Sequence, residues 1–222
     1  MPNSTTRTIS ELRCEYHART LARDDLAASP IQQFATWFQE ALDAGILEPN
    51  ALTLATIGLD GWPNSRTLLM KDFDETGVTI YTNYTSRKAA ELDANPAASL
   101  TFLWKELERQ VHVRGRVEKT TREESAAYFF SRPYGSRIGA WVSKQSQVIP
   151  NRTWLEERST KYETRYPDTG AADCVPLPDF WGGFRIVPET VEFWQGQPGR
   201  KHDRFLYRKD HEQSWTLARL SP

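Results

Sequence analysis

The chain has 222 residues, 39% of them hydrophobic, and its 28 Lys and Arg nearly balance its 29 Asp and Glu. This length allows one domain with a packed core, or two small ones. The formal net charge of -1 argues against a general nucleic-acid binder or membrane-surface protein, so any anion site has to be local. Cys14 and Cys174 lack a Cys-x-x-Cys spacing, which predicts neither a disulfide framework nor a structural zinc site.

The N-terminal segment, residues 1–29, is polar and charged and has few large apolar side chains. This composition predicts a mobile arm that becomes ordered when something binds it, followed by a single domain over residues 30–222. The segment has no apolar leader region, and no stretch approaches the roughly 18 apolar residues of a membrane span. We therefore expect a cytoplasmic protein that does not bind membranes.

The first predicted element is an amphipathic helix from Ser29-Pro30 to Gly45, because Ser is a good N-cap and Pro suits the first helical position. Short turns between the later β-rich runs imply antiparallel pairing, since parallel strands need long crossovers. The expected fold is α+β, a mainly antiparallel barrel with peripheral helices. In chain order we predict strands at 51–57, 65–71 and 78–83, a helix at 86–94, strands at 98–104 and 109–117, helices at 122–131, 136–143 and 151–166, and strands at 183–186, 190–195, 204–207 and 215–219.

The first segment with a chemical signal is Ser86-Arg87-Lys88, at the start of a predicted helix. Cations in a first turn oppose the helix macrodipole, and a bound phosphate would offset this. The alternative is a pair of solvated surface cations.

The run 65–71 places Arg66 and Lys71 at the two ends of an apolar strand. A regular strand would point them to opposite faces, which implies two anions or a bulge, unless the strand is a core strand with solvated ends.

Two further segments combine cations with other polar groups. Tyr128 and Arg132 are one helical turn apart, and Ser136 follows as a candidate N-cap, which together suit a phosphate clamp. The alternative is an Arg that only interacts with the carbonyls ending its helix.

A row of alternating cations follows at Arg200, His202 and Arg204. One strand face would carry all three and attract an anion, near the flat ring of Trp194. A solvated edge is the alternative.

Several common motifs are absent from the sequence. It contains no Gly-x-Gly-x-x-Gly, no phosphate-binding Gly-x-x-x-x-Gly-Lys-Ser/Thr, no His-Glu-x-x-His and no Gly-x-Ser-x-Gly. The four histidines lie at scattered positions without metal-ligand spacing, so we expect no metal. The sequence therefore lacks the motifs that indicate a dinucleotide-binding fold, a zinc protease or a serine hydrolase.

Taken together, the motifs resemble the pyridoxine/pyridoxamine 5'-phosphate oxidase family from Arg13 to the C-terminus. The resemblance implies an FMN-binding split β-barrel and a homodimer with FMN sites at the subunit interface. It also implies oxidation of pyridoxine 5'-phosphate and pyridoxamine 5'-phosphate to pyridoxal 5'-phosphate by O2, releasing H2O2 and, from the amine, ammonia. The segments that carry it are Arg13-Cys14-Glu15-Tyr16, 66–71, Tyr81-Thr82, Ser86-Arg87-Lys88-Ala89, Glu108-Arg109-Gln110-Val111, Ser131-Arg132-Pro133, 139–146, 180–185, 192–196 and His202-Asp203-Arg204-Phe205.

The resemblance also implies roles for individual residues. Arg200 and His202 would lie beside the substrate ring as the catalytic pair, with His202 the candidate general base because of its ordinary pKa. The remaining substrate contacts would be Arg13, Tyr16, Lys71, Tyr128, Arg132, Ser136 and Lys201. The FMN contacts would be Arg66, Thr67, Leu68, Leu69, Met70, Lys71, Tyr81, Thr82, Arg87, Lys88, Gln110, Gln145, Ser146, Trp194 and Arg204.

Two positions depart from the family pattern: Cys14 stands where Arg is common, and Lys201 where an apolar residue is common. They bear on substrate affinity more than on the type of reaction. Two rival functions stay open at this point. One is an FMN oxidase of the same fold acting on another substrate, such as a phenazine precursor. The other is a non-catalytic carrier of flavin or pyridoxal phosphate.

Overall fold

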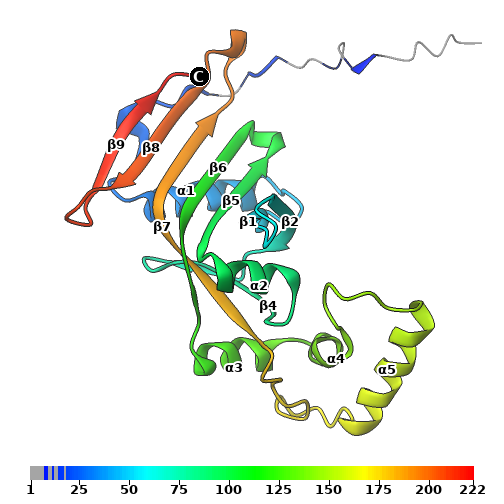
Figure 1. Ribbon diagram of the computed structural model, residues 1–222. Coiled ribbons are helices and arrows are strands. Elements are labelled where there is room, and N and C mark those ends of the chain that lie inside the picture. Colours follow the sequence, from blue (N-terminus) through cyan, green and yellow to red (C-terminus); the bar gives the residue numbers. More distant parts are fainter. Residues whose placement is uncertain (1–7, 10–11, 13–14, 18) are drawn as a thin grey trace, which may run out of the picture. The chain divides into compact units, whose positions relative to one another are not determined.

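The computed structural model describes residues 8, 9, 12, 15–17 and 19–222 (Figure 1). The chain forms two compact units, which we describe separately. Unit 1 contains residues 1–49, 103–111 and 191–222, and unit 2 contains residues 50–102 and 112–190. Among the helices of the described residues, none has both the length and the apolar character needed to span a bilayer. The division into an arm over residues 1–29 and one domain over 30–222 stays a prediction.

Unit 2 is built on a curled, mainly antiparallel sheet, which confirms the expected fold class (Figure 1). Its strand order is β2-β1-β5-β6-β7-β4-β3. Leu52, Leu54, Ile80, Leu100 and Phe102 are at most 2% exposed and form its centre. The strands are β1 (Ala51–Ile57), β2 (Pro63–Leu69), β3 (Asp72–Asp74), β4 (Gly77–Asn83), β5 (Ala97–Trp104), β6 (Arg109–Lys119) and β7 (Trp181–Gln195); the ends of β5, β6 and β7 belong to unit 1.

Four helices accompany this sheet: α2 (Arg87–Ala94), α3 (Arg122–Ser131), α4 (Tyr134–Val142) and α5 (Arg152–Arg165). Three of them begin at polar N-caps whose side chains accept a backbone hydrogen bond, namely Ser86, Thr121 and Asn151. Phe129, Ile138, Val175 and Trp181 form a second apolar cluster beneath α3 and α4. Packing on this cluster fixes the positions of α3 and α4, which contribute side chains to the candidate functional site.

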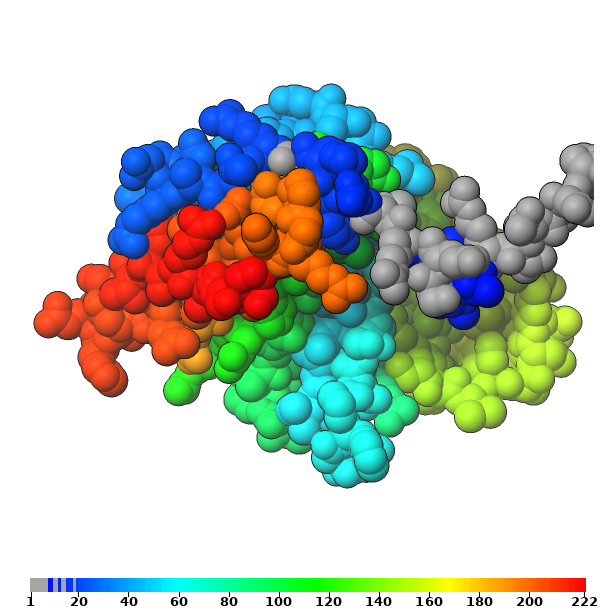
Figure 2. Space-filling model, turned by 90° about the horizontal axis from the view of Figure 1, so that it is seen from above, coloured from blue at the N-terminus to red at the C-terminus, as the bar shows by residue number. Residues whose placement is uncertain are grey.

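Unit 1 contains α1 (Pro30–Asp43), β8 (Asp203–Lys209), β9 (Trp215–Leu220) and three short 3-10 turns, η2 (Arg23–Asp25), η3 (Lys105–Leu107) and η4 (Pro198–Arg200). Ser29 caps α1 as predicted, by accepting from the backbone N-H of Ile31. The core of this unit is aromatic, and the rings of Trp37 and Phe193 meet edge to face at 5.1 Å. Figure 2 shows the red and orange C-terminal strands beside the blue N-terminal residues, where the hydroxyl of Tyr207 donates to the carbonyl of Ala27.

The structure corrects three predicted strands. The expected strands 183–186 and 190–195 form one strand, β7, because Pro188 lies beyond the end of the β4 ladder at Ile186 and its missing N-H costs no bond to β4. The expected strand 65–71 ends at Leu69, since the next backbone N-H groups turn to other partners, that of Lys71 to the carbonyl of Thr79. The short strand β3 was not predicted.

Candidate functional site

Unit 2 contains a cavity of about 320 Å³ lined by side chains from β4, α3, α4 and β7. It brings together two cations, two phenols, three aliphatic hydroxyls and two amides from separate segments of the sequence. Predicted site residues among its lining are Lys71, Tyr81, Thr82, Tyr128, Arg132, Ser136 and Gln145. Tyr128, Arg132 and Ser136 therefore line one cavity, and their role as a phosphate clamp stays a prediction.

Three stacked rings form one wall of the cavity. The ring centroids of Tyr81 and Tyr128 lie 4.2 Å apart with 22° between their planes, and those of Tyr81 and Trp181 lie 5.4 Å apart with 11°. The guanidinium of Arg132 lies over the Trp181 ring at 4.8 Å. Burial, and then the charge of Glu124, raise the pKa of Tyr81, so its hydroxyl stays neutral. Trp181 was not among the predicted site residues, although it lies within the segment 180–185 that carries the family resemblance.

Arg132 has an unusual environment for a cation. Its Nη1 atom is buried and has no hydrogen-bond partner among the residues that the structure describes. Burial lowers the pKa of the guanidinium, and the nearby Tyr128 opposes this only in part. A buried charged donor without a partner is unfavourable, and an anion in the cavity would supply its missing acceptor. This position therefore fits a phosphate group.

Ser136 lines the cavity but is not the N-cap that the sequence predicted. Helix α4 begins at Tyr134 with Pro133 in the cap position, so Ser136 lies inside the first turn. Its backbone N-H donates to the Pro133 carbonyl at 2.9 Å. The hydroxyl can still donate into the cavity. The alternation predicted for Arg66 and Lys71 likewise fails, because the strand ends before Lys71 reaches the cavity.

A second group of cations lies at the start of α2. Lys88 is 7% exposed, and its ammonium donates to the Thr82 hydroxyl at 3.2 Å and to Gln145 Oε1 at 2.7 Å. Burial, reinforced by the charge of Arg66, lowers the pKa of Lys88 to about 8. An ammonium has three donors, so one remains for a ligand. Lys88 is therefore not a solvated surface cation, whereas the Arg87 side chain is 60% exposed.

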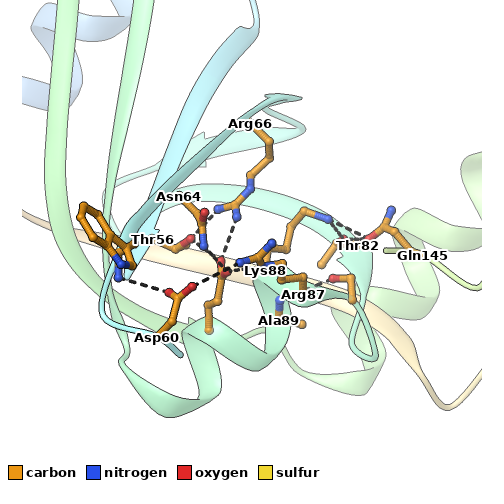
Figure 3. A network of polar contacts seen from close by, with 12 residues as sticks. Thr56, Asp60, Asn64, Arg66, Thr82, Arg87, Lys88, Ala89 and Gln145 are labelled. Carbon is orange, nitrogen blue, oxygen red and sulfur yellow. Dashed lines mark hydrogen bonds and ion pairs between the residues drawn. The ribbon is translucent and has the colours of Figure 1, made fainter. Parts of the chain in front are cut away.

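The two arginines near Lys88 share one buried carboxylate (Figure 3). Glu91 accepts from Arg66 Nη2 at 2.8 Å and from Arg87 Nε at 3.2 Å. With Lys88 these arginines give three positive charges, against the negative charges of Glu91 and Asp60. A positive surplus remains, which suits an anion. Glu91 was not predicted, because nothing in the sequence links it to Arg66, 25 residues earlier.

The remaining predicted contacts of unit 2 lie on β2 and after α4. Thr67 is exposed, Leu68 and Leu69 are half-buried and Met70 is buried. The backbone N-H of Met70 donates to the carbonyl of Asn50 at 2.8 Å. Ser146 is exposed and has a φ of 69°, which places it in a left-handed turn next to Gln145.

Unit 1 carries a separate cluster of rings. The ring centroids of Trp194 and His202 lie 4.7 Å apart. The ring of Tyr16 meets both edge to face, with centroid distances of 5.6 Å to Trp194 and 5.5 Å to His202. The backbone N-H of Gln197 donates to His202 Nδ1 at 3.1 Å. Beside this cluster lies a cavity of about 590 Å³ lined by Tyr16, Trp194, Gln110 and four other residues. Three predicted residues, Tyr16, Trp194 and His202, are thus neighbours, whereas Arg13 lies outside the described residues.

The predicted cationic row of Arg200, His202 and Arg204 is wrong as a strand face. Arg200 ends the turn η4 with a φ of 62°, and β8 begins only at Asp203, so Lys201 and His202 lie outside the strand. Arg204 is not an open cation, since its Nε donates to Glu192 at 2.8 Å. That hydrogen bond raises the pKa of Arg204. Arg200 and Lys201 are exposed and next to His202 in the chain.

Comparison with known proteins identifies close relatives. Residues 38–166 match the family model described as pyridoxamine 5'-phosphate oxidase, and residues 181–222 match the pyridoxine 5'-phosphate oxidase C-terminal dimerisation region. The pyridoxine/pyridoxamine 5'-phosphate oxidase of Paraburkholderia phytofirmans is 53% identical over 215 residues, covering 96% of this chain and 99% of the relative. That of Dichelobacter nodosus is 52% identical over 202 residues, covering 91% and 93%.

Two known structures share the fold. PhzG from Burkholderia lata 383, in complex with tetrahydrophenazine-1-carboxylic acid, is 28% identical with a TM-score of 0.84, covering 92% of this chain and 99% of that one. A pyridoxamine 5'-phosphate oxidase-related, FMN-binding protein from Nostoc punctiforme is 17% identical with a TM-score of 0.69, covering 87% and 98%. The second likeness supports the fold alone.

Proposed function

The chain belongs to the pyridoxamine 5'-phosphate oxidase family, and from that premise we propose that it oxidises pyridoxine 5'-phosphate and pyridoxamine 5'-phosphate to pyridoxal 5'-phosphate. The electron acceptor is O2, and the products include H2O2 and, from the amine, ammonia. This is the activity that the matched relatives carry in their names over nearly the full length of the chain. Identities above 50% make it the best-supported function.

We propose FMN as the cofactor. Bound FMN would supply the hydride acceptor for oxidation at C4' of the substrate, with O2 as the final electron acceptor. The surplus positive charge around Arg66, Arg87 and Lys88, and the third ammonium donor of Lys88, fit the flavin phosphate. The other proposed contacts are Thr67, Leu68, Leu69, Met70, Lys71, Tyr81, Thr82, Gln145 and Ser146 in unit 2, and Gln110, Trp194 and Arg204 in unit 1.

The single observation that carries the substrate assignment is the buried Nη1 of Arg132, which has no hydrogen-bond partner among the described residues. With Lys71, Tyr128 and Ser136 around the same cavity, it supports binding of the vitamer phosphate there. The phosphate takes hydrogen bonds from guanidinium, ammonium and hydroxyl donors. Holding the substrate at this end restricts its orientation, and positioning of this kind contributes up to about 7 to 11 kcal/mol in favourable cases.

The residues that the family resemblance assigns to the substrate ring, Arg200 and His202, belong to unit 1. Because His202 Nδ1 accepts from the Gln197 N-H, neutral His202 carries its proton on Nε2 and acts as a hydrogen-bond donor there. This differs from the expectation that His202 is a general base. The exposed cations of Arg200 and Lys201 favour negative charge nearby. We keep Arg13 and Tyr16 as proposed contacts from the N-terminal arm.

We further propose a homodimer with FMN sites at the subunit interface, located in the cytoplasm. The match of residues 181–222 to a dimerisation region supports the association of two copies. The proposed homodimer has one FMN site per chain, so the flavin content should approach one FMN per chain. Sedimentation or light scattering of the holoprotein measures the first property, and flavin absorbance measures the second.

The rival functions differ in a measurable way. An oxidase of a phenazine precursor shares the fold, as PhzG does, but that protein is only 28% identical. The clamp of Tyr128, Arg132 and Ser136 favours a phosphorylated substrate. The decisive assay is aerobic incubation of the FMN-loaded protein with pyridoxine 5'-phosphate, following pyridoxal 5'-phosphate absorbance and peroxide together. Many turnovers support the proposal, at most one equivalent indicates a carrier, and no product contradicts the substrate.

A further inference from the structure

Glu91 is the most completely bonded carboxylate near the candidate flavin site. Its side chain is 0% exposed, although it belongs to a surface helix, α2. Burial alone would raise its pKa, but hydrogen bonds from Thr56, Arg66 and Asn64 lower the pKa below its ordinary value. Glu91 is therefore a buried anion in the neutral pH range.

Glu91 accepts from four side chains, which belong to β1, β2 and α2. Figure 3 labels these donors, Thr56, Asn64, Arg66 and Arg87. Oε2 accepts from the Thr56 hydroxyl at 2.6 Å and from Arg66 Nη2 at 2.8 Å. Oε1 accepts from Asn64 Nδ2 at 2.7 Å and from Arg87 Nε at 3.2 Å. Thr56 on β1 lies directly opposite Asn64 on β2, and Arg66 follows two residues later on the same face. The sheet register thus brings three donors to one point under α2.

This arrangement fixes the two arginines and still leaves donors available. A guanidinium has five N-H donors. Arg66 uses one at Nη2 for Glu91 and one at Nη1 for Thr56, and Arg87 uses its Nε for Glu91. Three N-H donors of Arg66 and four of Arg87 make none of these hydrogen bonds and stay available for a ligand. Without Glu91, each guanidinium would be held by fewer partners and would lose rotamer freedom on binding.

The negative charge of Glu91, in contrast to its ordering of the arginines, disfavours phosphate binding. A carboxylate this close to a phosphate site repels the phosphate, so as a simple countercharge Glu91 would weaken binding. The two effects predict opposite signs when the charge is removed. This difference makes the role of Glu91 testable.

We propose that Glu91 is a positioning residue for the cofactor phosphate, which holds the guanidinium groups of Arg66 and Arg87 in the orientation that binds it. This inference rests on the proposed FMN function. It assigns to Glu91 no contact with the flavin itself. The positioning effect is proposed to exceed the repulsion.

The test compares FMN with riboflavin, which lacks the phosphate. Flavin fluorescence is titrated with the apoprotein of the parent, of Glu91→Gln and of Asp60→Asn. Glutamine keeps the shape but has one acceptor oxygen, so it cannot accept from both arginines, which bind opposite oxygens. Asp60→Asn removes the same charge from an exposed partner of Arg87. We expect Glu91→Gln to weaken FMN binding about tenfold, as for loss of one charged hydrogen bond. Riboflavin binding should stay within about twofold, and Asp60→Asn should leave FMN binding unchanged or tighter.

Three outcomes would overturn the inference. Unchanged or tighter FMN binding by Glu91→Gln would make Glu91 a countercharge only. Equal losses for FMN and riboflavin would indicate a merely structural role. If Glu91→Gln does not fold, Glu91→Asp keeps the charge but withdraws the carboxylate, and a normal FMN affinity in that variant would also contradict positioning. A parent protein that takes up no flavin would instead contradict the proposed function, and this inference with it.

Discussion

The Nδ1 atom of His202 accepts a hydrogen bond from the backbone N-H of Gln197 at 3.1 Å. An imidazole that accepts at Nδ1 carries its proton on Nε2 when neutral, so this contact selects one tautomer. We expect nitrogen-15 NMR of the neutral His202 ring to show a protonated Nε2 and an unprotonated Nδ1. A protonated Nδ1 would contradict this assignment. Gln197→Ala should preserve the tautomer, because the donor is the backbone, whereas Gln197→Pro should lose it.

Substitution Arg132→Ala should raise the Michaelis constant for pyridoxine 5'-phosphate by roughly 10- to 100-fold, as expected for loss of a charged hydrogen bond. The reason is the buried, unpartnered Nη1 in the cavity. Steady-state kinetics of the FMN-loaded variant provide the measurement. Arg152→Ala, which removes an exposed arginine of α5, is the matched control. An unchanged constant in Arg132→Ala would remove this residue from the clamp.

Substitution Arg200→Ala should reduce turnover strongly and leave the purified protein yellow. Arg200 is exposed, lies two residues before His202 in the chain and is not among the proposed FMN contacts. Turnover and flavin absorbance are measured on the same preparation. Loss of bound flavin combined with normal turnover after reconstitution would contradict the assignment.

FMN affinity should fall as pH rises above about 8, since burial lowers the pKa of Lys88 to about 8 and the phosphate prefers the protonated amine. One proton is taken up on binding in this range, so the dissociation constant should rise by up to about tenfold per pH unit. Fluorescence titration between pH 7 and 10 measures this, with phosphate-free riboflavin as control. Lys88→Arg should abolish the trend.

The stability of the apoprotein should rise with pH over part of this range. Between about pH 8 and 10.5 the Lys88 amine is protonated in the unfolded chain more than in the folded one. The contribution of Lys88 to the unfolding free energy therefore increases as the pH rises there.

Substitution Gly115→Ala should destabilise the protein by about 3 kcal/mol. A Cβ atom at this buried position of β6 would lie 2.0 Å from the carbonyl oxygen of Val187, which is backbone and cannot move aside easily. Gly135→Ala in α4 is the control, because a Cβ there meets nothing within 4 Å. Denaturant unfolding of both variants is the measurement. Equal stability of the two would contradict the close approach of β6 and β7.

Local signals in the sequence predicted much of the fold. Helix α3 has the predicted bounds because Thr121 and Glu124 form a capping box, which depends on residues three apart. β1 was also predicted with its observed bounds, from its β-branched and apolar residues. Errors arose where tertiary contacts decide, as at Lys71, whose N-H pairs with Thr79 rather than continuing β2.

The candidate site was predicted less completely, for the same reason. The residues around Arg132 could be grouped because they are neighbours in sequence. Burial of Lys88 could not be predicted, since its partner Gln145 lies 57 residues away. The row of Arg200, His202 and Arg204 failed because Gly199 and Arg200 both adopt left-handed backbone angles, which strand alternation does not anticipate.

The continuity of β7 has a consequence for how this chain can change. The strand carries Trp181, under the guanidinium of Arg132, at one end and Trp194, beside His202, near the other. Inserting or deleting a single residue between them would reverse the face of every side chain on one side of the change. Turns elsewhere can lengthen at little entropic cost. The number of residues separating these two tryptophans is therefore constrained by the alternating side-chain pattern of β7.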